Sequence, residues 1–481
     1  MNNNPIIYLS HWAKLKPNSK AIITPKFTIS YESLNQLVIK IANKFNQYGI
    51  NSKTSVMTCF VKKEVEWIIT LALMRVGCTS GSNHGYSNIN DLESVDWIIS
   101  DRELAFKKEG QVVIVNNQWL NELQTNLVNT EYSPPEIGER FSLTSGTTGR
   151  VKVVHRTYNQ VVSSAMAHCC TNPHYSNTLE LMRLSAGGGF THALAMLISG
   201  SPLYCAGGPQ SIYDIAKKYR IGCLSGSPTQ IGGLIQHLHQ SNLEPLNIQL
   251  VKYSGSQASK KLVKAIHKYL SPKIYTVYGS TEAGGIAGMY VDEKFQENVV
   301  GFVFPNSRVE IIKDGLPVFN EIGIVRVQSM NMVQSYQGDH VASAESFKDG
   351  WFYPGDRGLI NENGLLSILG RENDLINKGG VKIDPAQIDA SLTNHPNVQD
   401  AAIFSFEDHL GVTQLAAALV SNEQLNFKDV HAYLFNLHGS RAPKHIIRAN
   451  EIPRNHMGKV MRKELKEKFE PILLKTLSAK K

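Results

Sequence analysis

The segment from 142 to 152 has the composition of a loop that binds phosphate. It reads Ser-Leu-Thr-Ser-Gly-Thr-Thr-Gly-Arg-Val-Lys, and its last nine residues hold four hydroxyls, two glycines and two cations. Gly146 and Gly149 let the backbone approach a phosphate closely, while N–H groups and hydroxyls donate to its oxygens. The two cations offset the phosphate charge. The loop follows a predicted strand at Arg140–Leu143, which is the usual position of a phosphate-binding turn.

The spacing of this loop differs from that of a Walker loop. A Walker loop needs GxxxxGK followed by Ser or Thr. Here Gly146 and Gly149 are three residues apart, and Val153 follows Lys152. A plain surface loop rich in small residues is the alternative interpretation, because such residues are common in loops.

The loop closely resembles the signature of the adenylate-forming superfamily, which includes acyl- and aryl-CoA synthetases, adenylation domains and firefly luciferase. Val151 and Val153 depart from that signature, because Pro and Gly are usual at their positions. Further segments match motifs of the superfamily in the same order along nearly the whole chain. They are Tyr253-Ser-Gly-Ser-Gln257, Tyr278-Gly-Ser-Thr-Glu282, Tyr353-Pro-Gly-Asp-Arg-Gly358, Gly370-Arg-Glu-Asn-Asp-Leu375, Lys378-Gly-Gly-Val-Lys-Ile383 and Pro453-Arg-Asn-His-Met-Gly-Lys-Val460.

The resemblance implies a site for ATP and Mg²⁺. Tyr278 would stack on adenine, Thr281 would contact phosphate, and Glu282 would position Mg²⁺, since a carboxylate suits a hard cation. Asp356 would bind the ribose hydroxyls, because a carboxylate can accept two hydrogen bonds from a diol. The predicted ATP- and AMP-binding residues are Thr144, Ser145, Gly146, Thr147, Thr148, Gly149, Lys152, Gly255, Ser256, Gln257, Tyr278, Gly279, Ser280, Thr281, Asp356 and Arg371, with Glu282 and Thr147 as the magnesium ligands.

The resemblance also implies a catalytic lysine on a mobile C-terminal part. Lys459 matches the lysine that supports adenylation, and with Glu282 and Thr144 it forms the predicted catalytic set. Its alternative is one more lysine in a basic tail, since residues 443–481 hold eleven Lys or Arg against four Asp or Glu. Asn373 falls at the hinge position. The predicted thiol channel is Gly379, Gly380 and Lys382, with a simple hairpin turn as the alternative.

The implied reaction has two steps. A carboxylic acid attacks ATP to give acyl-AMP and pyrophosphate, and the acyl group then passes to the thiol of coenzyme A or of the phosphopantetheine on an acidic acyl or peptidyl carrier protein. Thr191 stands where amino-acid-activating members usually carry Asp, so the sequence favours an aryl or fatty acid. The predicted acyl pocket is Gly188, Phe190, His192, Ser227 and Gly279, although His192 is equally well explained as a core histidine. The alternatives are a stand-alone amino-acid-adenylating enzyme that loads a carrier protein and a non-catalytic acyl- or AMP-binding homologue.

The elements that position these residues alternate along the chain. Apolar spacing predicts helices at Tyr31–Gly49 and Glu64–Val76, with strands at Ser55–Phe60, Leu250–Ser254 and Lys273–Tyr278. This alternation is typical of an α/β fold with parallel strands. We expect a large N-terminal domain of layered α/β subdomains at residues 1–372, with a β-rich subdomain at about 299–370, and a small mobile α+β C-terminal domain at 373–481.

Composition narrows the class of protein. The chain has 481 residues, of which 42% are hydrophobic and 19% charged, as in an ordinary globular protein. We expect no membrane span, because no apolar run approaches 20 residues, and a cytoplasmic location, because the N-terminus lacks a signal peptide. The six cysteines lack metal-site spacing, so we expect free, mostly buried thiols, including Cys169 and Cys170 in the core. Most of the formal charge of +8 lies in residues 443–481, which could attract nucleic acid, a phosphate-rich cofactor or an acidic partner, although charge alone favours a solvated basic helix. We expect a monomer or homodimer that does not bind nucleic acid.

Overall fold

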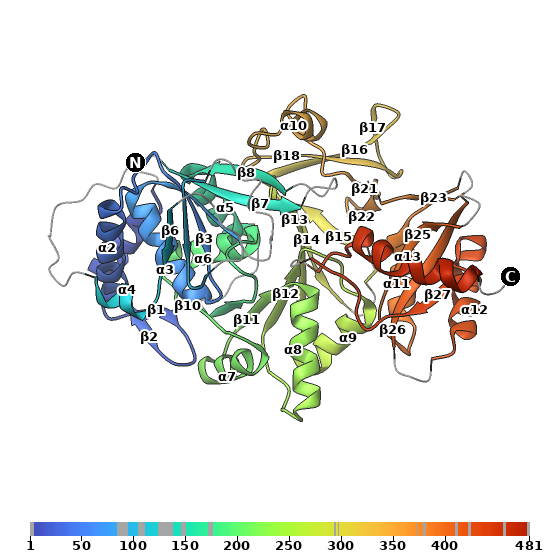
Figure 1. Ribbon diagram of the computed structural model, residues 1–481, viewed down its shortest axis with the longest axis horizontal. Coiled ribbons are helices and arrows are strands. Elements are labelled where there is room, and N and C mark those ends of the chain that lie inside the picture. Colours follow the sequence, from blue (N-terminus) through green and yellow to red (C-terminus); the bar gives the residue numbers. More distant parts are fainter. Residues whose placement is uncertain are drawn as a thin grey trace.

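A computed structural model describes residues 4–83, 95–103, 111–123, 138–145, 151–171, 177–292, 295–296, 298–372, 374–378, 381–408, 412–421, 425–455 and 458–478. In Figure 1 the N-terminal elements lie at the left and the C-terminal elements at the right-hand end. The fold class predicted above, layered α/β with a β-rich part and a small α+β part, is confirmed. The domain boundary at 372 and 373 stays a prediction.

The first sheet is six-stranded in the order β6-β5-β3-β4-β7-β8. Its pairs are parallel except β7 with β8. Its strands are β3 (Ser55–Cys59), β4 (Thr79–Ser82), β5 (Trp97–Ser100), β6 (Gln111–Ile114), β7 (Glu139–Ser145) and β8 (Val151–Thr157). The two valines that depart from the family signature lie in β8, and Val153 packs in a cluster with Phe141 and Leu143. They therefore extend the hairpin that carries the phosphate loop.

Helices cover this sheet because their apolar residues recur at helical spacing. In α2 (Tyr31–Gln47) the residues Leu34, Val38, Ile41 and Phe45 are buried, and the Ser30 side chain caps the first turn. The shared core also includes α1 (Ile6–Leu15), α3 (Lys63–Val76), α4 (Asn117–Asn121), α5 (Tyr158–Thr171) and α6 (Gly187–Ser199). A small sheet of β10 (Leu203–Tyr204), β1 (Lys20–Ile23) and β2 (Thr28–Ser30) lies beside them.

The second sheet begins with four parallel strands in the order β13-β12-β11-β9. They are β9 (Thr178–Glu180), β11 (Cys223–Gly226), β12 (Leu250–Ser254) and β13 (Ile274–Ser280), connected through α7 (Pro209–Tyr219), α8 (Pro228–Gln240) and α9 (Lys260–Tyr269). On one face Leu224 and Val251 pack with Ile231 of α8 and Ile266 of α9. Because β11, β12 and β13 run parallel, the segments that follow them meet at one edge.

The same sheet continues beyond β13 in an antiparallel arrangement, in the order β14-β15-β22-β21-β18-β16-β17. These strands are β14 (Gly284–Val291), β15 (Val299–Val303), β16 (Ser307–Lys313), β17 (Leu316–Val318), β18 (Gly323–Ser329), β21 (Asp356–Ile360) and β22 (Leu366–Arg371). The short strands β19 (Phe347–Lys348) and β20 (Trp351–Phe352) pair beside β18, next to α10 (His340–Ser346). The sheet therefore carries Asp356 and Arg371 on neighbouring strands.

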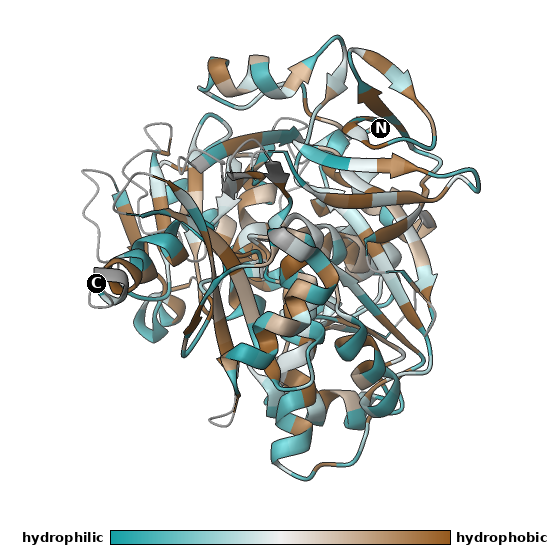
Figure 2. Cartoon of the chain, turned by 90° about the vertical axis from the view of Figure 1, so that its right-hand side faces the viewer, coloured by the Kyte–Doolittle hydropathy of each residue, from teal (hydrophilic) through white to brown (hydrophobic). Residues whose placement is uncertain are grey.

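The C-terminal part has its own sheet with helices on both faces. The order is β25 (Val398–Glu407), β26 (Thr413–Ser421) and β27 (His445–Arg448). Alternate residues face opposite sides. Ala401 and Ile403 pack against α11 (Pro385–Asn394) and α12 (Phe427–His438), whereas Phe404 and Phe406 pack against α13 (Arg462–Ser478). Figure 2 turns this end of the molecule toward the viewer, and it shows long brown stretches on strands and many teal stretches on helices.

The cysteines differ in how deeply they are buried. Four cysteines are buried, but Cys169 is half-buried and Cys170 is exposed, so the expectation of core packing is wrong for Cys170. The reason is that this pair lies in the last turns of α5, where adjacent residues point in different directions.

Within the described residues, none of the helices is long and apolar enough to cross a membrane.

Candidate active site

A cavity of about 1180 Å³ lies where the strand ends meet the C-terminal part. It is lined by the segments that follow β11, β12 and β13, as expected for a ligand site in an α/β sheet. Residues predicted from the sequence supply much of the wall: Thr144, Lys152, Gly188, Gly255, Ser256, Gln257, Tyr278, Gly279, Ser280, Thr281, Glu282, Asp356, Arg371 and Lys459. Segments separated by up to about 300 residues thus share one cavity.

At one part of the wall, Tyr278, Asp356 and Arg371 form a linked group. The Tyr278 hydroxyl donates to Asp356 Oδ2 at 2.5 Å, and Arg371 Nε lies 2.8 Å from Asp356 Oδ1. Burial, and then the Asp356 charge, raise the pKa of Tyr278 well above its usual value, so the phenol remains a donor. A carboxylate has further lone pairs beyond these two contacts, and Asp356 can therefore still accept hydrogen bonds from a diol.

Glu282 is held by a residue that the sequence motifs did not indicate. Tyr336 donates its hydroxyl to Glu282 Oε1 at 2.9 Å, and burial followed by the Glu282 charge raises the pKa of Tyr336. Lys152 Nζ lies 4.5 Å from the centre of the Tyr336 ring, and Lys152 pairs with Thr144 across the β7–β8 hairpin. The phosphate loop and the Glu282 turn are therefore joined through Tyr336.

Arg156 is a second residue that the motifs missed. It lies next to the last residue of β8, is 8% exposed and donates to the carbonyl oxygen of Thr281. Burial lowers the pKa of Arg156 to about 10, an effect that the Glu282 charge opposes. Arg156 also lines the cavity, so it adds a cation beside the predicted phosphate-binding residues. A basic residue at the end of the strand that follows the loop was the signal available in the sequence.

Lys459 enters the cavity from the C-terminal part on a tight turn. Gly458 has φ +81, a value that favours glycine, and a Cβ there would lie 2.5 Å from Oγ1 of Thr229. Glycine thus permits the turn to approach α8 closely. The Asn455 side chain accepts the backbone N–H of Lys459 at 3.0 Å, which fixes the direction of the chain at Lys459.

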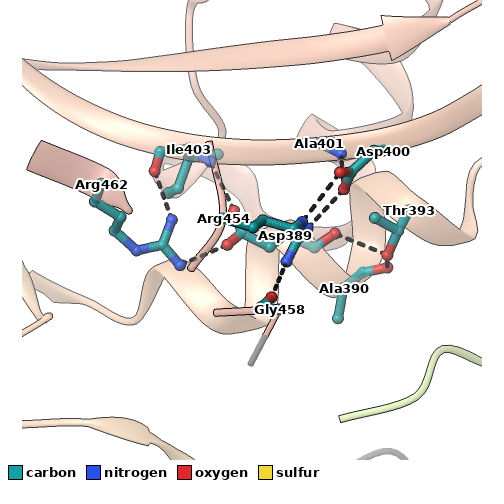
Figure 3. A network of polar contacts seen from close by, with 9 residues as sticks. All are labelled: Asp389, Ala390, Thr393, Asp400, Ala401, Ile403, Arg454, Gly458 and Arg462. Carbon is teal, nitrogen blue, oxygen red and sulfur yellow. Dashed lines mark hydrogen bonds and ion pairs between the residues drawn. The ribbon is translucent and has the colours of Figure 1, made fainter. Parts of the chain in front are cut away.

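Two Arg–Asp pairs hold this turn on the C-terminal sheet (Figure 3). Arg454 donates to both carboxylate oxygens of Asp400, at 3.1 and 2.6 Å, and to the Gly458 carbonyl at 2.7 Å. Arg462 pairs with Asp389 at 2.5 Å. Bidentate Arg–carboxylate pairs fix geometry as well as charge. The Arg454–Asp400 pair therefore links the position of the Lys459 turn to β25.

The surroundings of Lys459 determine the direction in which its pKa is shifted. More than a third of its surface is accessible, because it stands in a cavity, but the protein around it still removes much of its bulk hydration. This desolvation, with the nearby Arg371 charge, lowers the pKa of Lys459, and the charges of Asp356 and Glu282 oppose the shift. An incoming anion would favour the charged ammonium.

The structure differs from the predicted acyl pocket at three residues. Gly188 and Gly279 line the cavity, whereas Phe190, His192 and Ser227 are not among its lining residues. Phe190 and His192 lie inside α6 and are buried, and Phe190 packs against Trp67. The Ser227 hydroxyl caps α8 in a capping box with Gln230, a pattern that was visible in the sequence.

A neighbour of His192 lines the cavity instead. His168 of α5 belongs to the wall, and its ring centre lies 6.0 Å from that of His192. His192 is therefore one layer behind the surface that a ligand would touch.

Several predicted residues lie outside the described part of the chain: Gly146, Thr147, Thr148, Gly149, Asn373, Gly379 and Gly380. Ser145 ends β7, and Lys382 belongs to β24 (Val381–Ile383), which pairs with β23 (Ile376–Lys378) as an antiparallel hairpin. The roles of these residues stay predictions.

The donor set of the cavity suits a nucleotide with a hard cation. Among the described residues, no group of three His, Cys, Asp or Glu forms a metal site of its own. Glu282 nevertheless presents a carboxylate in the cavity wall. Its charge acts on Arg156, and Tyr336 contacts both Glu282 and Lys152. One carboxylate suffices for Mg²⁺ when phosphate oxygens and water complete its coordination.

Comparison with known proteins agrees with this geometry. Residues 110–337 match the model of the family described as AMP-binding enzyme. This segment is therefore an AMP-binding enzyme domain, and the chain has the fold of adenylate-forming enzymes.

Individual relatives match almost the whole chain. A 2-succinylbenzoate–CoA ligase from Geobacillus sp. (strain WCH70) is 26% identical over 494 residues, which cover 96% of each protein. Gramicidin S synthase 2 from Aneurinibacillus migulanus is 23% identical, over 94% of this chain but 11% of that relative. The structure of o-succinylbenzoate coenzyme A synthetase (MenE) from Bacillus subtilis with ATP and magnesium ion has a TM-score of 0.82 at 21% identity, over 95% of this chain and 99% of that one.

The Arg454–Asp400 pair leads to a first prediction. Asp400→Asn keeps the shape of the side chain but removes its charge, so the turn that carries Lys459 is held less firmly. We expect the maximal rate of acyl-AMP formation to fall roughly tenfold to a hundredfold, because small misplacements of a reacting group are costly. ATP–pyrophosphate exchange measures this rate.

The matched control is Asp429→Asn, an exposed change in the first turn of α12, which should leave the exchange rate unchanged. A wild-type rate for Asp400→Asn, or a loss explained by a lower melting temperature, would contradict this positioning role.

The lowered pKa of Lys459 leads to a second prediction. The ammonium attracts phosphate only when protonated, so activity is lost as the pH rises through its pKa. Because that pKa is below the usual 10.5, kcat/KM for ATP should begin to decline at a pH below 10.5. Lys459→Arg should move the decline to higher pH, since guanidinium stays protonated. An identical alkaline decline in both proteins would assign it to another group.

Proposed function

We propose that this protein converts an aromatic carboxylic acid to its acyl-AMP with ATP and then transfers the acyl group to coenzyme A. The observation that carries the proposal is the shared cavity. It brings Lys459 from the C-terminal part together with Glu282, Asp356 and Arg371 of the large part. The full-length match to a 2-succinylbenzoate–CoA ligase supports an aromatic acid and coenzyme A.

The first step joins the acid to AMP. A carboxylate oxygen attacks the α-phosphorus of ATP, and the bond to pyrophosphate breaks. Negative charge accumulates on phosphate oxygens, so the protein acts mainly by positioning and by electrostatic stabilisation. Asp356 would hold the ribose, Tyr278 would lie against adenine, and Lys459 would bridge the acid and the phosphate.

The cations around the phosphates have a related task. Lys152 and Arg156 would attract the phosphates, and Tyr336 would orient the Glu282 carboxylate through the hydrogen bond described above. Glu282 would hold Mg²⁺, which when bound supplies positive charge to the phosphate oxygens.

The second step uses AMP as a leaving group. A thiolate cannot displace oxide from a free carboxylate, whereas it can displace AMP from the acyl carbon. The sulfur–carbon bond forms, the carbon–oxygen bond to AMP breaks, and the thiol proton passes to solvent or to a base. The β23–β24 hairpin, with Gly379, Gly380 and Lys382, is the proposed entry for the pantetheine arm. Transfer to a carrier protein is the alternative second step. The monomeric or homodimeric state and the cytoplasmic location expected from the sequence also remain proposals.

The third prediction tests this function directly. ATP–pyrophosphate exchange would be measured with benzoates, 2-succinylbenzoate, fatty acids and amino acids. We expect exchange to rise with an aromatic acid, and coenzyme A then to yield its thioester.

Each other outcome points to a different activity. Exchange with amino acids alone would favour the amino-acid-adenylating alternative, which the match to gramicidin S synthase 2 represents. Binding of ATP without exchange for any acid would favour a non-catalytic homologue.

A further inference from the structure

The cavity contains a buried lysine that neither the motifs nor the proposed chemistry uses. Lys252 lies in the middle of β12, is 3% exposed and belongs to the cavity wall. In the described part of the chain, its Nζ has no hydrogen-bond partner. A buried ammonium without a partner is costly, by several kcal/mol as a general rule. Such a group is therefore more readily explained by a ligand than by packing.

The register of the sheet shows which residues accompany Lys252. Ser225 of β11 pairs with Lys252 on one side and with Glu180 of β9 on the other. Partners in neighbouring strands point to the same face, so Glu180, Ser225 and Lys252 form one polar row, and all three line the cavity. Parallel strands buried on both faces are normally apolar on both. This row is therefore an exception that faces the ligand space.

Glu180 does not serve as the partner of Lys252. Two strand spacings separate their backbones, roughly 9.6 Å, and no ion pair joins them among the described residues. The Glu180 carboxylate instead accepts the Met182 N–H at 2.9 Å. The Lys63 ammonium is also on the Glu180 side, where it donates to the Glu180 and Met182 carbonyls, both at 2.9 Å. The Glu180 charge also acts on Lys63, so Glu180 has another cation near it and the Lys252 charge is left for another anion.

The position of Lys252 relative to the reaction site limits how far apart the two anionic groups of such an acid can be. Lys252 comes four residues before Ser256, which lies next to the Lys459 turn. Four residues of strand span at most about 13 Å. An acid whose reacting carboxylate is near Lys459 can therefore place a second anionic group at Lys252 if several bonds separate the two.

We propose that Lys252 binds a second carboxylate of the acyl substrate and so makes the enzyme selective for dianionic acids. This inference rests on the proposed function for the identity of the reaction. Lys252 acts by charge and hydrogen bonding to the end of the acid that does not react. The same pocket should reject monoanionic analogues, because they leave the ammonium buried and unpaired.

The experiment compares acids that differ by one distal carboxylate. The pairs are 2-succinylbenzoate with 3-benzoylpropionate, and adipate with hexanoate. ATP–pyrophosphate exchange would be measured with the wild type, with Lys252→Met, which keeps the length but not the charge, and with Lys252→Arg. Lys264→Met, an exposed lysine of α9, is the matched control.

We expect the wild type to prefer the dianionic member of the pair that it uses. Lys252→Met should lower kcat/KM for that member by roughly tenfold to a hundredfold, the range for loss of a hydrogen bond to a charged group, and leave the monoanionic member within about threefold. Lys252→Arg should retain part of the preference. Equal loss for both members, or a wild-type preference for the monoanion, would overturn the inference.

Two further readouts separate this inference from the proposed function and from misfolding. The melting temperature of Lys252→Met should be equal or higher, because methionine removes an unpaired buried charge, whereas a lower value would indicate a structural lysine. Calorimetric binding of each acid needs no turnover. Binding of the dianion that depends on Lys252, without any exchange, would support the inference and reject the proposed function. Exchange at the same rate with and without the Lys252 side chain would support the proposed function and reject the inference.

Discussion

The ammonium of Lys459 has to stand among the charges of Asp356, Arg371 and Glu282, and the remaining structure meets this requirement. Lys459 belongs to the C-terminal part, whereas the other three belong to the large part. The two parts therefore need contacts that are close and specific. Gly458 provides one of them, since only glycine allows the turn to lie against Thr229. A hydrogen bond from Lys261 to the Val398 carbonyl at 3.2 Å provides another.

Within each part, the sheets carry the functional groups to this meeting point. The parallel strands β11, β12 and β13 end at one edge, while the antiparallel continuation brings β21 and β22 beside them with Asp356 and Arg371. The β7–β8 hairpin reaches the same cavity and is tied to the Glu282 turn through Tyr336. Polar residues line the cavity face of the sheet, and apolar residues pack on α8 and α9. The same strands thus supply both stability and chemistry.

The sequence predicted the parts of the site that short motifs specify. Glu282, Asp356 and Lys459 each lie in a compact motif whose residue types suit phosphate or ribose, and all three reach the cavity. Tyr336 and Lys252 were missed because each acts across the fold without a local motif, although a lysine inside the apolar strand Leu250–Ser254 was a usable signal. Phe190 and His192 were assigned to the cavity because the prediction did not fix where α6 begins. With Gly187 at its first turn, their side chains face the core.

The most direct test of the account separates the two half-reactions in Lys459→Ala. Acyl-AMP formation would be followed by pyrophosphate exchange, and thioester formation would be followed from acyl-AMP supplied in advance with coenzyme A. If Lys459 bridges the acid and the phosphate, the variant should lose acyl-AMP formation by several orders of magnitude and retain most thioester formation. Equal loss of both half-reactions, or retention of the first, would contradict the role of Lys459 on which the account depends.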